Sequence, residues 1–127
     1  MATIFSANES TVMLNGEMVE GVRSLEYRRH QARTNVYALG NAERIGMTSG
    51  PQVVEGRLRV ASTSPALSAL AADTPFVLTA LLRQRDSKKT VSFDECFLVE
   101  SSFEIAAGSH GEAVYAFTAT RVREENA

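Results

Sequence analysis

Residues 54–62 show the clearest strand pattern of the chain and read Val54-Glu55-Gly56-Arg57-Leu58-Arg59-Val60-Ala61-Ser62. The charged residues Glu55, Arg57 and Arg59 alternate with glycine and apolar residues. Successive side chains of a strand point to opposite faces, so this period of two predicts one dry face and one wet face. Another strand, over residues 22–28, precedes it with a less regular alternation.

Segment 31–52 connects these two strands and is long for a connection within a compact domain. It holds the charged residues Arg33, Glu43 and Arg44. It also holds turn-forming and large apolar residues, which are Gly40, Gly46, Gly50, Pro51, Val36, Tyr37, Leu39, Ile45 and Met47. A solvated linker gains nothing from apolar side chains, so we predict an arm or hairpin that becomes ordered against another subunit. The alternative is a floppy surface insertion.

The composition indicates one globular domain over residues 1–127. No apolar run approaches the length needed to span a bilayer, and the start of the chain lacks the basic and apolar regions of a signal peptide. We therefore expect a protein that is made and kept in the cytoplasm. Cys96 is the only cysteine, which excludes an internal disulfide. The net charge of -2 gives no general attraction to nucleic acid.

Asn15 and Gly16 follow a short apolar strand and predict a hairpin turn, because both tolerate the positive φ of a type I′ turn. Residues 1–9 precede this hairpin as a polar N-terminal segment. After the turn we expect one strand over residues 17–28, with a bulge at Gly21.

Residues 64–72 carry the clearest helix signal, with Ser64 as N-cap and Pro65 at the first helical position. The nearly continuous apolar run over residues 76–83 predicts a strand with both faces covered. Further strands are expected over residues 90–99 and 112–122, before a charged tail from residue 123, and residues 102–106 are either another short strand or the first of these strands continued after a kink. In the first of them, one face is expected to carry Val91, Phe93, Phe97 and Val99. Together these elements predict a mainly β fold, a small antiparallel β-barrel or sandwich with one short helix and a long inter-strand loop.

The residue types that carry catalysis or bind metals do not form a constellation in this sequence. His30 lies beside two arginines and His110 lies in a glycine-flanked turn, and neither has metal-ligand spacing. Cys96 falls within an expected strand, where a buried inert thiol is the ordinary state. Asp94 and Glu95 are adjacent, so a strand points them to opposite faces and they form no carboxylate pair. We therefore predict no catalytic, cofactor-binding or metal site, and a protein that is not an enzyme.

Three short motifs occur along the first half of the chain. Residues 10–19 resemble a hairpin that ends in a (D/N)GE turn, and residues 22–27 resemble a strand of the form hydrophobic–x–(S/T)–(L/F)–E. Leu39-Gly40, Arg44 and Gly46 resemble a loop that carries Leu-Gly, Arg and Gly in this order. With the helix and the strands that follow, the chain resembles the tail tube protein family of contractile and long-tailed bacteriophages. That family includes the inner-tube proteins of phage-derived injection machines.

The resemblance implies a structural subunit without catalysis or cofactor. Such a subunit assembles as stacked hexameric rings that form the hollow channel of a phage tail or contractile injection system. The implied location is the virion tail, after assembly in the cytoplasm of the bacterial host. The implied partners are further copies of the chain together with a sheath protein, a baseplate and a tail terminator. A genome or effector cargo passes through the lumen without sequence-specific binding, and no membrane is involved.

The resemblance also implies roles for two groups of residues. Contacts to a neighbouring subunit or ring are expected from Arg33, Tyr37, Leu39, Gly40, Arg44, Ile45, Gly46 and Met47. The lumen is expected to be lined by the wet strand face with Glu55, Arg57 and Arg59. A different class of function is a small cytoplasmic β-barrel that acts as a binding or adaptor module, in which Arg57 and Arg59 hold an anionic ligand or a protein partner. A third class, an enzyme that uses Cys96 or His110, lacks the partner residues for catalysis.

Overall fold

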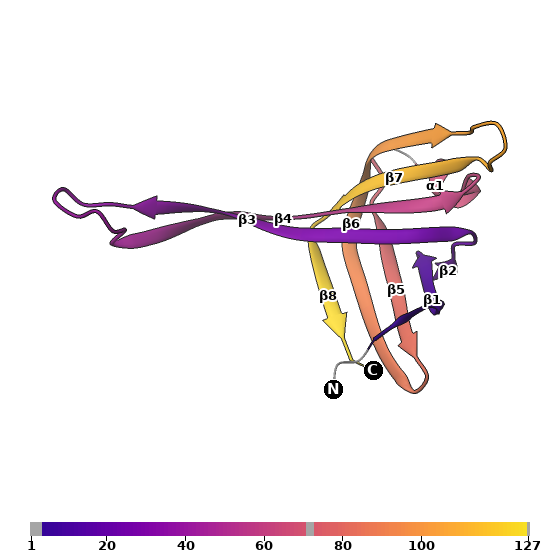
Figure 1. Cartoon of the computed structure of the whole chain (residues 1–127), viewed down its shortest axis with the longest axis horizontal. Coiled ribbons are helices and arrows are strands. Elements are labelled where there is room, and N and C mark those ends of the chain that lie inside the picture. Colours follow the sequence, from indigo (N-terminus) through magenta and orange to yellow (C-terminus); the bar gives the residue numbers. More distant parts are fainter. Residues whose placement is uncertain (1–3, 71–72, 127) are drawn as a thin grey trace.

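The computed structural model describes residues 4–70 and 73–126. Figure 1 shows the elements, whose bounds are β1 Ser6–Leu14, β2 Glu17–Met18, β3 Val22–Val36, β4 Gly46–Ala61, α1 Pro65–Ser68, β5 Phe76–Gln84, β6 Ser87–Glu104, β7 Glu112–Ala119 and β8 Arg121–Glu125. The predicted mainly β class with one short helix is confirmed for the described residues. β1 begins inside the predicted N-terminal segment 1–9, of which residues 1–3 lie outside the described residues.

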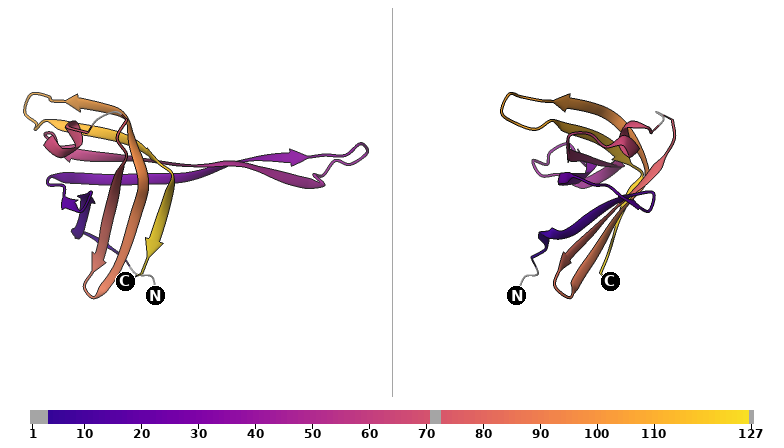
Figure 2. Two further views of the ribbon diagram at one scale, coloured as in Figure 1. Left: turned by 180° about the vertical axis from the view of Figure 1, so that it is seen from behind. Right: turned by 90° about the vertical axis from the view of Figure 1, so that its right-hand side faces the viewer.

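The strands form one antiparallel sheet in the order β2-β1-β5-β6-β7-β4-β3, with β8 paired to β6. The sheet folds over into two halves, which the right-hand view of Figure 2 shows as a wedge. One half, the arm sheet, consists of β3, β4, β7 and residues 97–104 of β6. The other half, the base sheet, consists of β1, β2, β5, β8 and residues 87–96 of β6. β2 and β3 end the order and do not pair with each other, so the sheet is not closed into a barrel within one described chain.

The core lies between the two halves of the sheet. The dry and wet faces predicted for residues 54–60 are confirmed, since the apolar members are buried and the charged members are exposed. Phe93 of β6 is fully buried at the centre. Its ring meets the rings of Tyr27 and Phe117 edge to face, at centroid distances of 5.0 and 5.3 Å. This geometry suits aromatic quadrupoles and joins β3, β6 and β7 in one cluster.

The helix α1 covers one end of this core and is shorter than the predicted range 64–72. Ser64 is the N-cap as predicted, and its Oγ accepts a hydrogen bond from the backbone N–H of Leu67 at 3.3 Å. The Leu67 side chain is fully buried. The helix ends at Ser68, whose Oγ lies 2.9 Å from the hydroxyl oxygen of Tyr115. Ala71 and Ala72 of the predicted helix lie outside the described residues.

β6 belongs to both halves of the sheet and bends where it passes between them. Glu95 adopts a φ of 49° at this point. This residue interrupts the regular alternation of side chains between the two faces of β6, as the extra residue of a bulge does. Phe93 and Cys96 are consequently both fully buried, while Val99 is 68% exposed. The prediction that Phe97 and Val99 continue the face of Phe93 is therefore wrong. Periodicity alone does not reveal a bend that the pairing partners impose.

Other strand boundaries also differ from the predictions. The expected strand over residues 17–28 is broken by a turn, in which Gly21 has a φ of 77°. The expected strand over residues 112–122 is broken at Thr120, and part of the expected charged tail from residue 123 belongs to β8. These breaks occur where the chain passes from one half of the sheet to the other, since β7 pairs in the arm sheet and β8 in the base sheet.

β5 corrects a further prediction. Phe76 and Leu78 of β5 are buried, but Val77 between them is 40% exposed. The strand therefore has only one covered face in this chain, in contrast to the prediction of two.

Of the two alternatives for residues 102–106, the continuation of the preceding strand is confirmed, because β6 runs on after its bend through Glu104.

β3 and β4 continue beyond the body of the molecule as a long hairpin, which we call the arm (residues 31–52; Figure 1). Gln31 pairs with Gln52, and Val36 pairs with Gly46. The long inter-strand loop expected here is thus mostly strand, and the connecting loop itself is only residues 37–45. Each strand of the arm satisfies backbone groups of the other, so the arm holds its shape without a core of its own.

The turn at Asn15 and Gly16 has the expected geometry, with φ values of 50° and 86°. We expect Gly16→Val to destabilise the protein by about 1–2 kcal/mol, because a side chain at positive φ is strained even where space is open. A Cβ atom at Gly16 would meet no other atom within 4 Å, so strain is the only cost. Urea unfolding measures the change. Gly46→Val is the control, because Gly46 has equal space without positive φ; equal unfolding midpoints for both variants would contradict the turn assignment.

Candidate assembly surfaces

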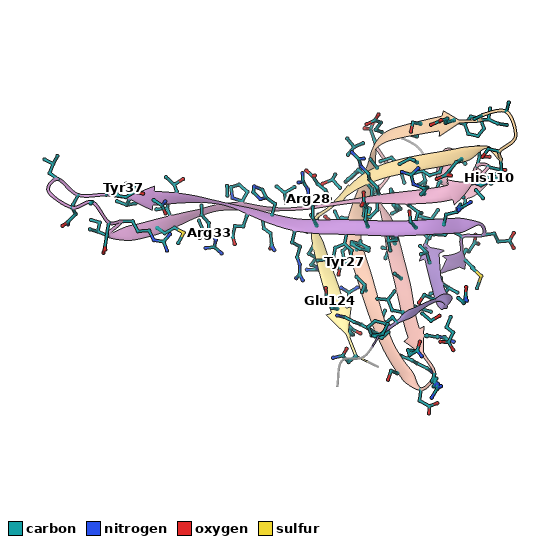
Figure 3. The ribbon with its side chains drawn as sticks, viewed as in Figure 1. Tyr27, Arg28, Arg33, Tyr37, His110 and Glu124 are labelled. Atoms are coloured by element: carbon teal, nitrogen blue, oxygen red, sulfur yellow. The ribbon has the colours of Figure 1, made fainter. Side chains whose placement is uncertain are left out.

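The arm exposes apolar side chains far from the core. The exposed large residues there are Val36, Tyr37, Leu39, Ile45 and Met47. Polar contacts hold the loop in shape, because Arg44 Nη1 donates to Asn35 Oδ1 at 3.1 Å and Arg33 Nη1 donates to Ser49 Oγ at 3.2 Å. Figure 3 shows Arg33 and Tyr37 well away from the body of the molecule. Apolar residues gathered on a projection that has no core indicate a surface that binds a partner.

The predicted inter-subunit residues are therefore together in space, all of them on the arm. Tyr37, Leu39, Gly40, Arg44 and Ile45 lie in the connecting loop. Arg33 lies on β3, and Gly46 and Met47 begin β4.

The outer face of the arm sheet is polar and carries Glu55, Arg57 and Arg59 side by side on β4. Glu55 accepts from Arg28 Nη2 at 2.9 Å, and Arg59 Nη1 donates to Glu112 Oε1 at 2.9 Å. The hydrogen bond from Arg59 lowers the pKa of Glu112 below its ordinary value. Exposed pairs of this kind contribute little stability, so they set the charge of the surface rather than hold the fold together.

A shallow depression of about 530 Å³ lies on this face next to Arg57. Its charged lining residues are Glu26, Arg28, Glu55, Arg57 and Glu100. The carboxylates therefore outnumber the guanidinium groups around Arg57. This mixture does not favour an anionic ligand in the depression.

The root of the arm is fixed to the base sheet by Glu124 of β8. Tyr27 Oη donates to Glu124 Oε1 at 2.6 Å, and the same oxygen lies 3.3 Å from Arg29 Nη2. Lys89 Nζ of β6 lies 3.1 Å from the other carboxylate oxygen. Burial, followed by the hydrogen bond to Glu124, raises the pKa of Tyr27 to about 12. Figure 3 shows Tyr27 and Glu124 where the arm leaves the body.

Sequence reasoning missed this cluster because Glu124 was placed in a charged tail. The range 121–125 reads Arg-Val-Arg-Glu-Glu, and its one apolar residue, Val122, is too little to indicate the alternation of a strand.

Asp94 ties β8 to β6 in a second ionic cluster. Its carboxylate accepts from Arg121 Nε at 2.7 Å and from Arg123 Nε and Nη2 at 2.8 and 3.0 Å. The hydrogen bonds from Arg123 and then from Arg121 hold the pKa of Asp94 below its ordinary value. The cluster lies next to the bend of β6 and holds β8 against the base-sheet part of β6.

Acid should weaken the fold through Asp94. A carboxyl group with a lowered folded-state pKa stabilises the protein above its unfolded pKa of about 3.9, and this contribution is lost as the pH falls through the folded value. We therefore expect the urea midpoint to fall between about pH 5 and pH 2, and to fall less in Asp94→Asn. Asp86→Asn, in the exposed turn before β6, is the control that should follow the wild type. Parallel pH profiles of the wild type and Asp94→Asn would rule out this role.

The candidate reactive groups are not arranged for chemistry. Cys96 is fully buried and its Sγ donates to the carbonyl oxygen of Phe93 at 3.3 Å. Burial raises the pKa of this thiol to about 12, so little thiolate exists at neutral pH. His110 Nε2 lies 2.8 Å from Arg23 Nη1 and 3.7 Å from Glu112 Oε2, in an exposed ionic cluster. Across residues 4–70 and 73–126, no group of three His, Cys, Asp or Glu side chains is placed to hold a metal ion.

In the described part of the chain, no helix has the length and apolar character to cross a bilayer.

Known proteins resemble this chain in structure but not in sequence. No family model and no curated protein sequence matches it. A chain of the sheath–tube complex of PVC, an extracellular contractile injection system, superposes with a TM-score of 0.70 at 12% identity, over 98% of this chain and 93% of that one. The SPP1 tail tube gives 0.67 at 6% identity, over 98% and 80%. The tail of an empty gene transfer agent particle, with C6 symmetry, gives 0.64 at 9% identity, over 96% and 98%.

These likenesses extend over nearly the whole chain, and at such identities they establish the fold. The arm, the bent sheet and the short helix of this chain therefore make up the fold that is found in the tubes of phage tails and contractile injection systems.

Proposed function

We propose that the chain is a structural subunit of a hollow tube, built from stacked hexameric rings, that forms the channel of a phage tail or contractile injection system. The observation that carries the proposal is the pair of unpartnered edges of the arm sheet, together with the likeness in fold to tube proteins. Within residues 4–70 and 73–126, β3 has a strand partner only on its β4 side, and residues 97–104 of β6 only on their β7 side. Edges of this kind are templates for pairing with another chain.

The strand directions of the arm sheet suit a ring. The sheet contributes four segments in the order β6-β7-β4-β3, and each is antiparallel to the next. With an even number of segments, β3 of one copy runs antiparallel to β6 of the next copy when copies are related by rotation alone. The same antiparallel ladder then continues from copy to copy until it closes, and closure removes the two exposed edges of the arm sheet.

In such a ring the outer face of the arm sheet becomes the lumen. This is the face with Glu55, Arg57 and Arg59, whose charges are hydrated and partly paired. A surface of mixed charge, whose one depression beside Arg57 is lined by both carboxylates and guanidinium groups, has no element that reads bases, so cargo moves through without sequence-specific binding. The opposite face carries the core and the base sheet, which then form the outside of the tube.

The arm supplies the contact between rings. It continues the strand direction of β3 and β4, so it extends beyond the ring to which it belongs (Figure 2). Its exposed apolar residues become buried against a subunit of the neighbouring ring. A sheath protein, a baseplate and a tail terminator are the partners that such a tube would meet on its outside and at its ends, in a virion tail assembled in the host cytoplasm.

Negative-stain electron microscopy of the purified chain, with light scattering on the same sample, tests the proposal. We expect rings with a central hole, or long hollow tubes. A protein that stays monomeric as its concentration is raised would overturn the proposal. Chemical modification of the face with Glu55, Arg57 and Arg59 distinguishes rings from long tubes. In single rings the face should react as fast as in monomers, because the lumen is open. In long tubes it should react more slowly, because the reagent enters only at the ends.

A further inference from the structure

An apolar groove opens between the two halves of the sheet, along the free edge of β3. Its volume is about 610 Å³. The apolar side chains that line it include Val12, Met18, Val19, Val22, Leu25 and Leu82. Glu20 and Arg23 are the charged residues of its lining. An apolar groove of this size at an unpaired sheet edge is costly to leave in water.

Exposed apolar side chains occur at the opposite edge of the arm sheet. Phe103 at the end of β6 is 55% exposed, and the neighbouring Ile105 is 67% exposed. Both cover Gly111, where an added Cβ atom would lie 2.7 Å from Phe103 Cζ and 3.8 Å from Ile105 Cδ1. Phe103 pairs with Ala113, which is buried, so the two side chains stand on the core side of the sheet.

The groove and the exposed pair lie at opposite ends of one row of cross-strand neighbours in the arm sheet. The register connects Val22 to Val60, Val60 to Ala113, and Ala113 to Phe103. Val22 lines the groove at one end of the row, and Phe103 stands at the other end on the same side of the sheet. When β3 of one copy is placed beside β6 of the next, the exposed pair therefore comes to the mouth of the groove.

We propose that Phe103 and Ile105 of one copy insert into the groove under β3 of the next copy. The inference rests on the proposed ring and identifies the apolar contact that closes it. Each subunit boundary then has a shared β-ladder with an apolar plug on its outer side. The occupant of the groove is a second copy of this chain, because the plug and the groove lie at matching ends of the same row.

A pair of matched variants tests the plug. Phe103→Asp puts a charge into the groove mouth, whereas Ser102→Asp puts the same charge on the adjacent residue, which faces the lumen. We expect Phe103→Asp to weaken association at each boundary by at least about tenfold and to abolish rings, since an apolar side chain loses its burial there. Ser102→Asp should still form rings. Because Phe103 is half-exposed, both variants should keep the wild-type thermal midpoint.

The outcomes separate the plug from the ring itself. Rings in the wild type and in Phe103→Asp at equal yield would overturn the plug and leave the proposed function intact. Loss of rings in both Asp variants would also overturn it, because the effect would then not depend on the face. A wild type that forms no rings would overturn the proposed function, and the plug with it.

Cross-linking tests the same contact in an intact assembly, without a substitution designed to break it. Variants Phe103→Cys and Met18→Cys are mixed and treated with a short bis-maleimide, while Cys96 stays unreactive because it is buried. A covalent dimer that forms in the mixture, and in neither variant alone, supports the plug. A mixture that forms rings by electron microscopy without this dimer would overturn it.

Discussion

Deletion of residues 34–49 should give a subunit that folds and forms rings but does not form tubes. The deleted residues include none of the buried core, so the free energy of unfolding should change little. The deletion joins Arg33 to Gly50, and the remaining hairpin turns through Ala32, Arg33, Gly50 and Pro51 above the paired Gln31 and Gln52. A turn of this length that contains glycine is a common hairpin connection. The contacts that we propose between rings, in contrast, are removed altogether.

Electron microscopy and light scattering of the deletion variant measure the result. We expect single rings at every concentration at which the wild type forms tubes. The control is Thr34→Ala with Thr48→Ala, which changes a cross-strand pair of the arm and keeps its apolar loop. Leu39→Asp with Ile45→Asp should reproduce the deletion, because the two apolar side chains of the loop become charged. Tubes of normal length from the deletion variant would show that the arm does not connect rings.

Gly56→Val should be the most destabilising single substitution in the arm sheet, at about 3 kcal/mol or more. A Cβ atom at Gly56 would lie 2.4 Å from Phe117 Cζ and 2.9 Å from the backbone oxygen of Glu26. The ring of Phe117 packs against Phe93, so it has no free space to enter. The Glu26 oxygen belongs to the neighbouring strand and moves only with it. A loss of this size is a large part of the whole stability of a small domain.

Denaturant unfolding of Gly56→Val checks this expectation, and Gly56→Ala should give a smaller loss in the same direction. A double-mutant cycle identifies the cause. Phe117→Leu removes the ring that occupies the space, so Gly56→Ala should cost less in that background than in the wild type. Additive losses would mean that the Phe117 ring is not the obstacle. An unchanged midpoint for Gly56→Val would contradict the packing described for the core.

Some parts of the fold were predictable because local chemistry determines them. The alternation of residues 54–60 follows from one buried face, the turn at Asn15 and Gly16 from positive φ, and the start of α1 from Ser64. Other parts depend on partners distant in the sequence. The bend of β6 at Glu95 arises because its two ends pair with different strands.

The strands of the arm could not be predicted from the sequence either. Its two strands are exposed on both faces along most of their length, so burial imposes no period of two on residues 31–52. Backbone pairing, which has no signature in side-chain hydrophobicity, is what orders them. Its apolar residues still indicated a binding surface, and they lie together on the arm. The Tyr27 and Glu124 contact was not predictable, because it needs β8 beside the root of the arm.

The continuity of β4 from the arm into the sheet determines how the molecule carries mechanical load. Residues 46–53 of β4 lie in the arm, and residues 54–61 are hydrogen-bonded to β7 in the body. A pull on the arm along its length therefore acts parallel to these strands and loads the β4–β7 hydrogen bonds together, in shear. Such a load is shared by the whole ladder, whereas a perpendicular pull opens hydrogen bonds one after another. A tube joined through arms of this kind resists extension along its axis and yields more readily to forces from the side.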